Sequence, residues 1–305
     1  GIQSEANNPL NYVGLIKVDL LNGDTNRIRG YFSKIESLLP SKKNNTIILS
    51  KEKQAIVYIK LAEAYLKAKI KNNQKVFEYL MRAQTLNDKN PELYLILGDY
   101  YMEMNDGSKA IGMYKKVQEL DPKSSKSNLR IGQLWVRAKN YNDALGYYKD
   151  AITIDPNFAP AYRELGELYA LANRYSDAKE NYKKFLELSN KNIAAKVRYG
   201  QFLFMTKDYN DAITQINEVI AIDSSFNNLN RIIAWSYYEA NHDFDKGLRF
   251  IEKFLKISDP KKVLAKDYVY YGRLLAKNNK DSLAVINLNK AFEMDKEANV
   301  ELLSD

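Results

Sequence analysis

A period of 34 residues runs through most of this chain and limits the folds that it can adopt. Glycines stand 34 positions apart, and alanines twelve positions after each glycine keep the same spacing: Gly98, Gly132, Gly166 and Gly200, then Ala110, Ala144, Ala178 and Ala212. A fixed period between 20 and 50 residues is typical of proteins built from stacked copies of one supersecondary unit. The sequence therefore predicts a repeat architecture.

One unit, residues 125–158, shows what is repeated. Residues at spacings of three and four share one face of a helix in each half: Asn128, Ile131, Gly132 and Trp135, then Ala144, Tyr148, Ala151 and Ile154. Lys139 and Asn140 between the halves leave room only for a tight turn. Each unit is therefore predicted to be a pair of antiparallel amphipathic helices.

The recurring glycine lies inside the first predicted helix, where it costs about 1 kcal/mol relative to alanine. Such a cost implies a packing reason. We expect that the missing side chain lets the second helix approach closely, with the small alanine of the second helix as the counterpart.

This pattern resembles the tetratricopeptide repeat, a helix–turn–helix unit of 34 residues. The resemblance implies an all-α fold, a right-handed α-solenoid. In its frame four repeats are unbroken and three are looser, after an N-terminal hairpin and a linker: 1–40 (hairpin), 41–54 (linker), 55–90, 91–124, 125–158, 159–192, 193–226, 227–264 and 265–298.

Neither end of the chain shows a polar cap, which a solenoid needs to close its hydrophobic ends. Residues 299–305 look like the start of a further helix. We therefore expect the chain to be an internal piece of a longer array.

Several classes of chemistry find no support in the sequence. The chain has no Cys and one His, which excludes thiolate metal sites and thiol nucleophiles and makes a Ser/His/Asp triad improbable. No phosphate-binding loop, dinucleotide fingerprint or metalloprotease motif is present. No apolar run approaches the roughly 18 residues of a membrane span. We expect no catalytic residues, no cofactor, no metal and no small-molecule substrate.

Surface recognition remains as the predicted function. The resemblance implies that certain positions of each first helix line a concave groove that binds a protein or peptide segment. Applied to this sequence, it gives twelve candidate partner-binding residues, a mixture of charged, amide and exposed aromatic side chains with Trp235 the most notable: Lys126, Arg130, Gln133, Arg163, Glu167, Arg198, Gln201, Phe204, Arg231, Trp235, Tyr238 and Arg273. Trp, Tyr and Arg dominate interface hot spots. Packing of Trp235 against the neighbouring repeat is an equally weighted alternative.

Two more specific hypotheses can be weighed. The net charge of +8 suggests nucleic-acid binding, but Lys and Arg are dispersed among acidic residues, as on a solvated surface. Single-stranded nucleic-acid binding by the basic and aromatic groove is thus the alternative function.

Some tetratricopeptide domains clamp chaperone C-termini with Lys and Asn at set positions of consecutive repeats. No three consecutive repeats here show that set, which disfavours a chaperone-tail clamp.

We therefore predict a noncatalytic protein-interaction scaffold. The sequence also resembles long bacterial tetratricopeptide proteins of the cell envelope, in residues 11–14 and 267–272. That resemblance implies an envelope or periplasmic location, with the cytoplasm as the alternative.

Overall fold

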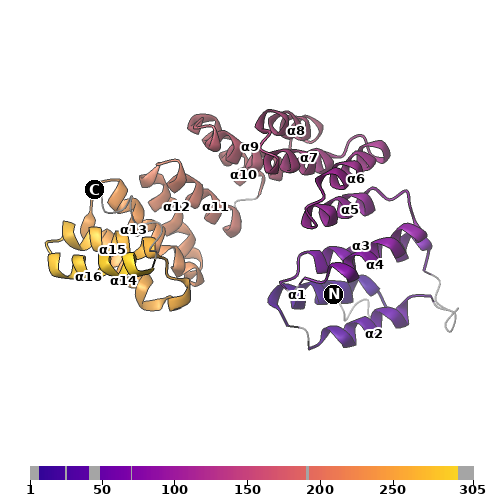
Figure 1. Cartoon of the computed structure of the whole chain (residues 1–305), viewed down its shortest axis with the longest axis horizontal. Coiled ribbons are helices and arrows are strands. Elements are labelled where there is room, and N and C mark those ends of the chain that lie inside the picture. The colour runs from indigo at the N-terminus through magenta and orange to yellow at the C-terminus, as the bar shows by residue number, and fades with distance from the viewer. Residues whose placement is uncertain (1–6, 25, 41–48, 70, 190–191, 295–305) are drawn as a thin grey trace. The chain divides into compact units, whose positions relative to one another are not determined.

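The computed structural model describes residues 7–24, 26–40, 49–69, 71–189 and 192–294. Within these ranges the chain forms sixteen α-helices, two short 3-10 helices and no strand (Figure 1). The all-α prediction is therefore confirmed.

The chain divides into two compact units, 1–158 and 159–305. The first unit holds four helical pairs, α1 Pro9–Asn22 with α2 Ile28–Leu38, α3 Lys51–Leu66 with α4 Asn73–Leu86, α5 Pro91–Glu103 with α6 Gly107–Leu120, and α7 Ser125–Arg137 with α8 Tyr141–Ile154. The second holds α9 Ala159–Leu171 with α10 Tyr175–Leu188, α11 Ile193–Met205 with α12 Tyr209–Ile222, α13 Asn230–Glu239 with α14 Phe244–Ile257, and α15 Ala265–Lys277 with α16 Asp281–Met294. Within each unit, hairpins stack side by side as in a helical solenoid.

Each regular hairpin is closed by a bulky side chain of the second helix that lies against the glycine of the first. A Cβ atom at Gly132 would lie 2.4 Å from the ring of Tyr148, and one at Gly98 would lie 2.2 Å from the ring of Tyr114. The packing reason for the glycine is thus a close contact between helices. The side chain that fills the space lies sixteen positions after the glycine, while the expected alanine, twelve positions after it, approaches through its backbone: a Cβ atom at Gly166 would lie 3.2 Å from the carbonyl oxygen of Ala178.

The turn inside the hairpin uses a left-handed residue. Six such turns have a non-glycine residue with φ between 54° and 65°: Asn105, Lys139, Asn173, Lys207, Asn241 and Asn279. The next residue donates its backbone N–H to a carbonyl five positions earlier, as Asn140 does to Trp135 at 2.9 Å. This arrangement ends the first helix and reverses the chain within two or three residues.

The structure differs from the expected boundaries at the end of the linker. Helix α3 begins at Lys51, so residues 51–54 are helical although the linker was expected to run to residue 54; the Ser50 side chain starts the helix by accepting a hydrogen bond from the Lys53 N–H. In the repeat 227–264, both connections contain 3-10 turns, η1 Ser224–Leu229 and η2 Pro260–Lys262. The predicted helix start at 299–305 and most of the linker lie outside the described residues.

Candidate partner-binding groove

A cavity of about 440 Å³ lies between α9 and α11, the first helices of two consecutive repeats in the second unit. Three of the twelve candidate residues line it, namely Glu167, Arg198 and Gln201. Leu171 and Met205 line the same cavity, and these two side chains are 65% and 68% exposed. Leu171 and Met205 thus add exposed apolar surface to the wall of the cavity.

Two stacked aromatic rings form part of the wall of the same cavity. The ring of Tyr182 lies 4.1 Å from that of Phe202, with an interplanar angle of 15°. The Tyr182 hydroxyl donates a hydrogen bond of 3.0 Å to Glu167. Burial and the nearby Glu167 carboxylate raise the pKa of Tyr182, so the hydroxyl stays a donor at neutral pH. The cavity wall is therefore pre-organised before any partner binds.

The two arginines near this cavity differ in whether a carboxylate of the fold pairs with them. Arg163 donates to Glu164 and lies 3.8 Å from Glu167, so its charge is balanced within α9. Arg198, by contrast, is exposed and lines the cavity, and no carboxylate of the described residues lies within ion-pair distance of it. Arg198 is the candidate cation that is available to a partner.

A second cavity, of about 660 Å³, adjoins the first through Gln201, which lines both. Residues of η1 and η2 form part of its wall, together with Arg231, Trp235 and Phe254. These connections are the ones in which the repeat departs from the regular 34-residue unit.

Arg231 holds this part of the molecule together. Its guanidinium lies 2.9 Å from the carboxylate of Asp267, donates a hydrogen bond of 2.7 Å to the Lys262 carbonyl and sits 4.2 Å from the Phe254 ring centroid. The Asp267 side chain is fully buried, and the Arg231 side chain is 18% exposed. Burial lowers the pKa of Arg231 and raises that of Asp267, because it disfavours both charges. Arg231 is thus paired within the fold, joining α13 to α15.

The expectation that Trp235 is an exposed aromatic residue is wrong. Its side chain is 7% exposed, and its ring stacks on Tyr270 at 5.4 Å and lies 5.7 Å from Phe204. The alternative of packing against neighbouring repeats describes it, because Phe204 belongs to α11 and Tyr270 to α15. Trp235 nevertheless lines the second cavity.

The last three candidates of the second unit are partly buried in aromatic contacts. Phe204 packs on Tyr209 as well as Trp235, Tyr238 packs on Phe244 and Tyr270, and the Arg273 guanidinium lies 5.7 Å from the Tyr238 ring centroid. These side chains support the helix surface and present only part of their area to solvent.

The remaining candidates, Lys126, Arg130 and Gln133, lie on α7 in the first unit. Arg130 makes two hydrogen bonds to Asp99, of 2.7 and 3.1 Å, and donates to Gln133 at 3.1 Å. Asp99 also accepts from the Tyr114 hydroxyl at 2.9 Å. Lys126 is exposed. Arg130 therefore links α7 to α5 within the fold.

Sequence reasoning missed the exposed apolar pair. Leu171 and Met205 are the last residues of their helices, one position beyond those that the family resemblance assigns to the groove. Glu103 and Arg137 occupy the same place in the preceding repeats. A change from charged to apolar residues at one repeat position is a signal that could have identified the pair.

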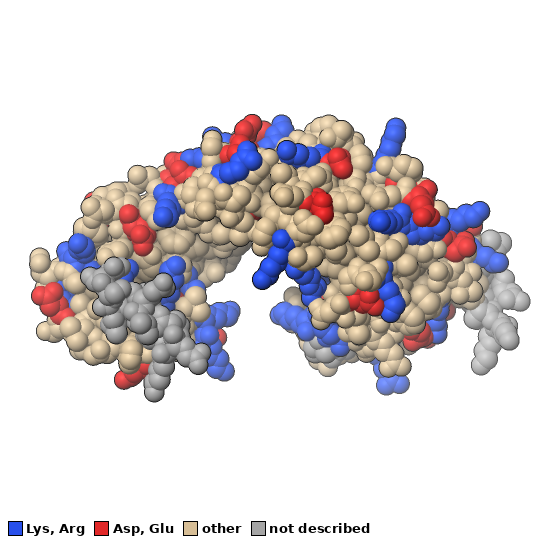
Figure 2. Space-filling model, turned by 45° about the horizontal axis from the view of Figure 1, so that its top comes forward, with Lys and Arg blue, Asp and Glu red and all other residues tan. Residues whose placement is uncertain are grey.

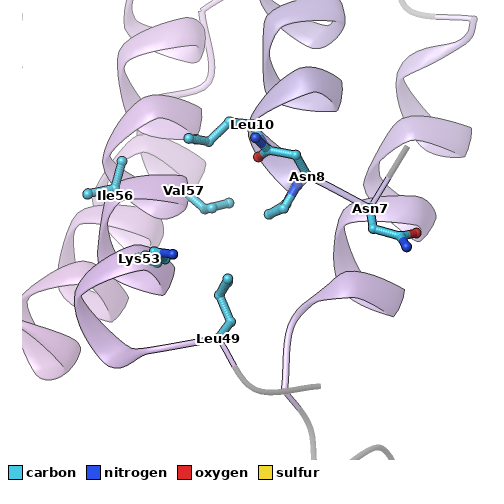
Figure 3. A pocket seen from close by; sticks show the side chains of 8 residues that line it. Asn7, Asn8, Leu10, Leu49, Lys53, Ile56 and Val57 are labelled. Carbon is cyan, nitrogen blue, oxygen red and sulfur yellow. The ribbon is translucent and has the colours of Figure 1, made fainter. Parts of the chain in front are cut away.

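A third cavity, of about 550 Å³, lies in the first unit where α1 and α3 begin. Figure 3 shows Leu10, Leu49, Ile56 and Val57 around it, with Lys53 and the amides of Asn7 and Asn8 at its edges. None of the twelve candidates lines it.

Other kinds of site find no support in the part of the chain that the structure describes. No three His, Asp or Glu side chains there come close enough to hold a metal ion. Among the described helices none combines the length and the apolar character that crossing a membrane requires. On the face that Figure 2 shows, Lys and Arg lie close to Asp and Glu in several places.

These observations define the class of a helical-repeat protein. Two sequence profiles described as tetratricopeptide repeat match the chain, one over residues 136–181 and 170–234 and the other over 96–157. The chain contains tetratricopeptide repeats, matched over residues 96–234. Repeats of this family generally mediate protein–protein interactions and are generally noncatalytic.

Solved structures share the fold at low sequence identity. A structure from the functional characterisation of Pseudomonas aeruginosa pilF shares 14% sequence identity with this chain at a TM-score of 0.51, and the match covers 81% of this chain and 94% of that one. A tetratricopeptide repeat protein from Parabacteroides merdae has 20% identity and a TM-score of 0.54, covering 82% and 97%. A chain of the APC/C hetero-tetramer Cut9–Hcn1 has 14% identity and a TM-score of 0.59, covering 90% and 51%. A comparison with curated protein sequences gives no significant match.

Proposed function

We propose that this chain is a noncatalytic scaffold that binds a segment of a partner protein in the groove between α9 and α11. The observation that carries the proposal is the exposed pair Leu171 and Met205 beside the cavity that Arg198 and Gln201 also line. Burial of two such side chains yields about 1.5–3 kcal/mol each. The prearranged wall reduces the entropy lost on binding.

The fold is compatible with this role. One structural neighbour is a chain of a hetero-tetramer, so a protein of the same fold assembles with other protein chains. The alternative function, single-stranded nucleic-acid binding, would need a basic face with accessible aromatic rings. Trp235 is buried and Arg130, Arg163 and Arg231 are paired with carboxylates, which favours the protein partner.

Site-specific photocrosslinking in the source cell tests the proposal. A photoreactive phenylalanine at Gln201 is expected to capture a polypeptide, and the double variant Leu171→Lys, Met205→Lys is expected to abolish that adduct. The matched control is Ile222→Lys, an exposed apolar residue at the end of α12 in the same unit. An adduct that persists in the double variant contradicts the proposal.

Nuclease treatment and salt separate the two functions. An adduct that nuclease removes, or a complex that weakens by orders of magnitude between low and moderate salt, would indicate nucleic acid. A complex held by apolar contacts is expected to change only modestly over that range.

The location in the cell envelope stays a prediction, and its support is the family resemblance of the sequence. Fractionation of the source cell with a tagged chain tests it directly. Recovery in the cytoplasmic fraction would contradict it.

A further inference from the structure

We propose that the helices α1 and α16 join copies of this chain head to tail, with the outer face of α16 in one copy packed on the outer face of α1 in the next. This inference goes beyond the proposed function and does not depend on the groove between α9 and α11. Its basis is the way in which neighbouring hairpins meet inside the chain.

Neighbouring hairpins meet through one kind of joint. The second helix of one hairpin packs on the first helix of the next: α4 on α5, α6 on α7, α10 on α11, α12 on α13 and α14 on α15. In two of these joints the same helix positions meet. The ring of Phe77, the fifth residue of α4, lies 5.7 Å from the ring of Tyr100, the tenth residue of α5. Leu248 and Leu274, the fifth residue of α14 and the tenth of α15, belong to one hydrophobic core.

Helix α16 exposes the half of this joint that a second helix provides. Val285 and Phe292, its fifth and twelfth residues, are 57% and 44% exposed. In α12 and α14 the residues at these two positions pack in cores that include the hairpin that follows, namely Ile213 with Ile220, and Leu248 with Leu255. Among the described residues no hairpin follows α16. The outer face of α16 thus has the composition of a joint between hairpins and is open to solvent.

Helix α1 exposes an apolar stripe on its outer face. Its members lie at spacings of four, four and three residues, which places them on one side of the helix, and all of them are exposed: Leu10, Gly14, Val18 and Leu21. The stripe contains no charged residue. A Cβ atom at Gly14 would have nothing of the described chain within 4 Å, so another helix can approach the backbone closely there.

The equivalent face of α7 shows what such a stripe contacts. Arg130 is the sixth residue of α7, as Gly14 is of α1, and it donates to Asp99 of α5 at 2.7 Å. Arg137 is the thirteenth residue, as Leu21 is of α1, and it donates to a backbone carbonyl near the end of α5 at 2.9 Å. This face is therefore the one by which a first helix meets the preceding hairpin. In the described part of the chain no hairpin precedes α1.

A second copy of the chain fits because it carries both halves of the joint. The face of α16 is that of a second helix, and the face of α1 is that of a first helix. In the proposed contact Val285 of one copy lies against Val18 of the next, since these are the fifth and tenth residues of their helices. A solenoid with apolar outer faces needs a cover at its ends. Contact between two different faces joins copies in a row or a ring.

Mixing two variants, each with one blocked face, tests the proposal. Val18→Lys blocks α1 and Val285→Lys blocks α16, because each places a charge in an apolar contact. At about 0.1 mM, a concentration that suits weak association, sedimentation equilibrium of the wild-type 305-residue chain is expected to show dimers and larger species. Each variant alone is expected to be monomeric. An equal mixture is expected to form dimers and nothing larger, because each variant keeps one intact face of the opposite kind.

Ile286→Lys is the matched control. Ile286 is 61% exposed on α16 and points about 100° away from Val285 around the helix, so this variant is expected to associate like the wild type. A monomeric wild-type chain overturns the proposal and indicates that another segment covers these faces. Association that Val18→Lys abolishes and Val285→Lys leaves intact also overturns it, because that result indicates contact between two α1 helices.

Disulfide formation maps the register of the contact, because the chain has no cysteine of its own. Under mild oxidation, an equal mixture of Val18→Cys and Val285→Cys is expected to give a crosslinked pair, which requires Cβ atoms about 4 Å apart. A mixture of Val18→Cys and Ile286→Cys is expected to give none. Crosslinking of Val18→Cys with itself in preference to Val285→Cys contradicts the proposed contact.

The outcome is separate from that of the proposed function. The unfolding midpoint of each variant checks that it is folded. The photocrosslinked adduct at Gln201 is expected to persist in Val18→Lys and Val285→Lys, and the double variant Leu171→Lys, Met205→Lys is expected to associate like the wild type.

Discussion

At the scale of single residues, a bulky side chain of the second helix packs on the glycine of the first helix in the regular hairpins; it is a tyrosine in three of them and Ile216 in the fourth. The glycine pattern and the need for close packing could be predicted from the sequence, since only a packing gain offsets the cost of glycine in a helix. The side chain that packs on the glycine could not be predicted from the sequence, because Ala144 and Tyr148 both lie on the same face of the second helix. Helix rotation and tilt decide which of them meets Gly132, and these depend on tertiary packing.

A matched pair of substitutions in one repeat tests this contact. Gly132→Ala is expected to destabilise the protein by about 1–3 kcal/mol, because the new methyl group would overlap the buried ring of Tyr148. Gly146→Ala, on the exposed face of α8 with nothing within 4 Å, is expected to stabilise it by about 0.5–1 kcal/mol. Urea unfolding midpoints measure both. Equal effects of the same sign would contradict the contact.

The left-handed turn residue gives a second prediction at this scale. Lys207 has φ of 65°, a conformation that costs an L-residue about 1–2 kcal/mol. Lys207→Gly is therefore expected to raise the free energy of unfolding, by about 1 kcal/mol at most because glycine also gains entropy in the unfolded chain. Lys183→Gly, in the exposed part of α10, is expected to lower it by about 1 kcal/mol. A loss of stability in Lys207→Gly would show that the lysine side chain contributes more than its backbone strain costs.

At the scale of helices, an ion cluster on α3 links neighbouring elements. Glu63 accepts from Lys67 at 2.6 Å and from Lys60 at 3.2 Å, and it lies 3.7 Å from Lys17 of α1. Burial opposes ionisation of Glu63, but the two hydrogen-bonded lysines outweigh it and lower its pKa to about 2. The folded state therefore favours the ionised form.

The pKa of Glu63 predicts how stability depends on pH. Because the folded value lies below the ordinary value of 4.5, the stabilisation is complete above about pH 4.5 and is lost as the pH falls toward 2. The variant Glu63→Gln is expected to show a smaller loss of stability over this range. Thermal unfolding at several pH values measures it, with Glu180→Gln, at an exposed site of α10, as the control. An identical pH profile for wild type and Glu63→Gln would refute the prediction.

The buried pair of Arg231 and Asp267 gives the strongest expected effect on stability. Arg231→Ala is expected to destabilise the protein by about 3–5 kcal/mol, because it leaves the Asp267 carboxylate buried without a cation. Arg249→Ala, whose partner Asp245 is exposed like Arg249 itself, is expected to change stability by less than about 1 kcal/mol. Unfolding free energies compare the two. Similar losses of stability in Arg231→Ala and Arg249→Ala would indicate that the Asp267 carboxylate becomes protonated or hydrated in Arg231→Ala.

At the scale of the whole molecule, the chain consists of units whose contacts are local. Helices contact their hairpin partner and the adjacent hairpin in each unit. Stability in such repeat proteins is approximately a sum over repeats and their nearest neighbours. A change in one unit is thus expected to remain local.

Hydrogen exchange on the 305-residue chain tests that locality. Gly132→Ala is expected to accelerate amide exchange in α7, α8 and the adjacent α6, while rates in α13–α15 stay unchanged. Arg231→Ala is expected to accelerate amide exchange in α13–α15, while rates in α6, α7 and α8 stay unchanged. Acceleration over both units by either substitution would show that the chain unfolds as a single cooperative structure.

The sequence predicted the architecture better than the site. The period located the helical pairs, because each position in a regular repeat meets the same neighbours. The candidates Arg130, Arg231 and Trp235 were chosen by position and residue type, and the structure shows each engaged with a neighbouring helix. Whether a helical residue faces solvent or the next hairpin depends on the spacing of adjacent repeats. That spacing changes where the connections lengthen, at η1 and η2.

The glycine–tyrosine contact also bears on how such a chain can change its length during evolution. In the pairs Gly98 with Tyr114 and Gly132 with Tyr148, both partners belong to the same hairpin. A gene duplication or deletion of one 34-residue segment would therefore carry the closing contact with it, and the recombined neighbours would meet equivalent surfaces. An array of this kind can become longer or shorter by whole hairpins.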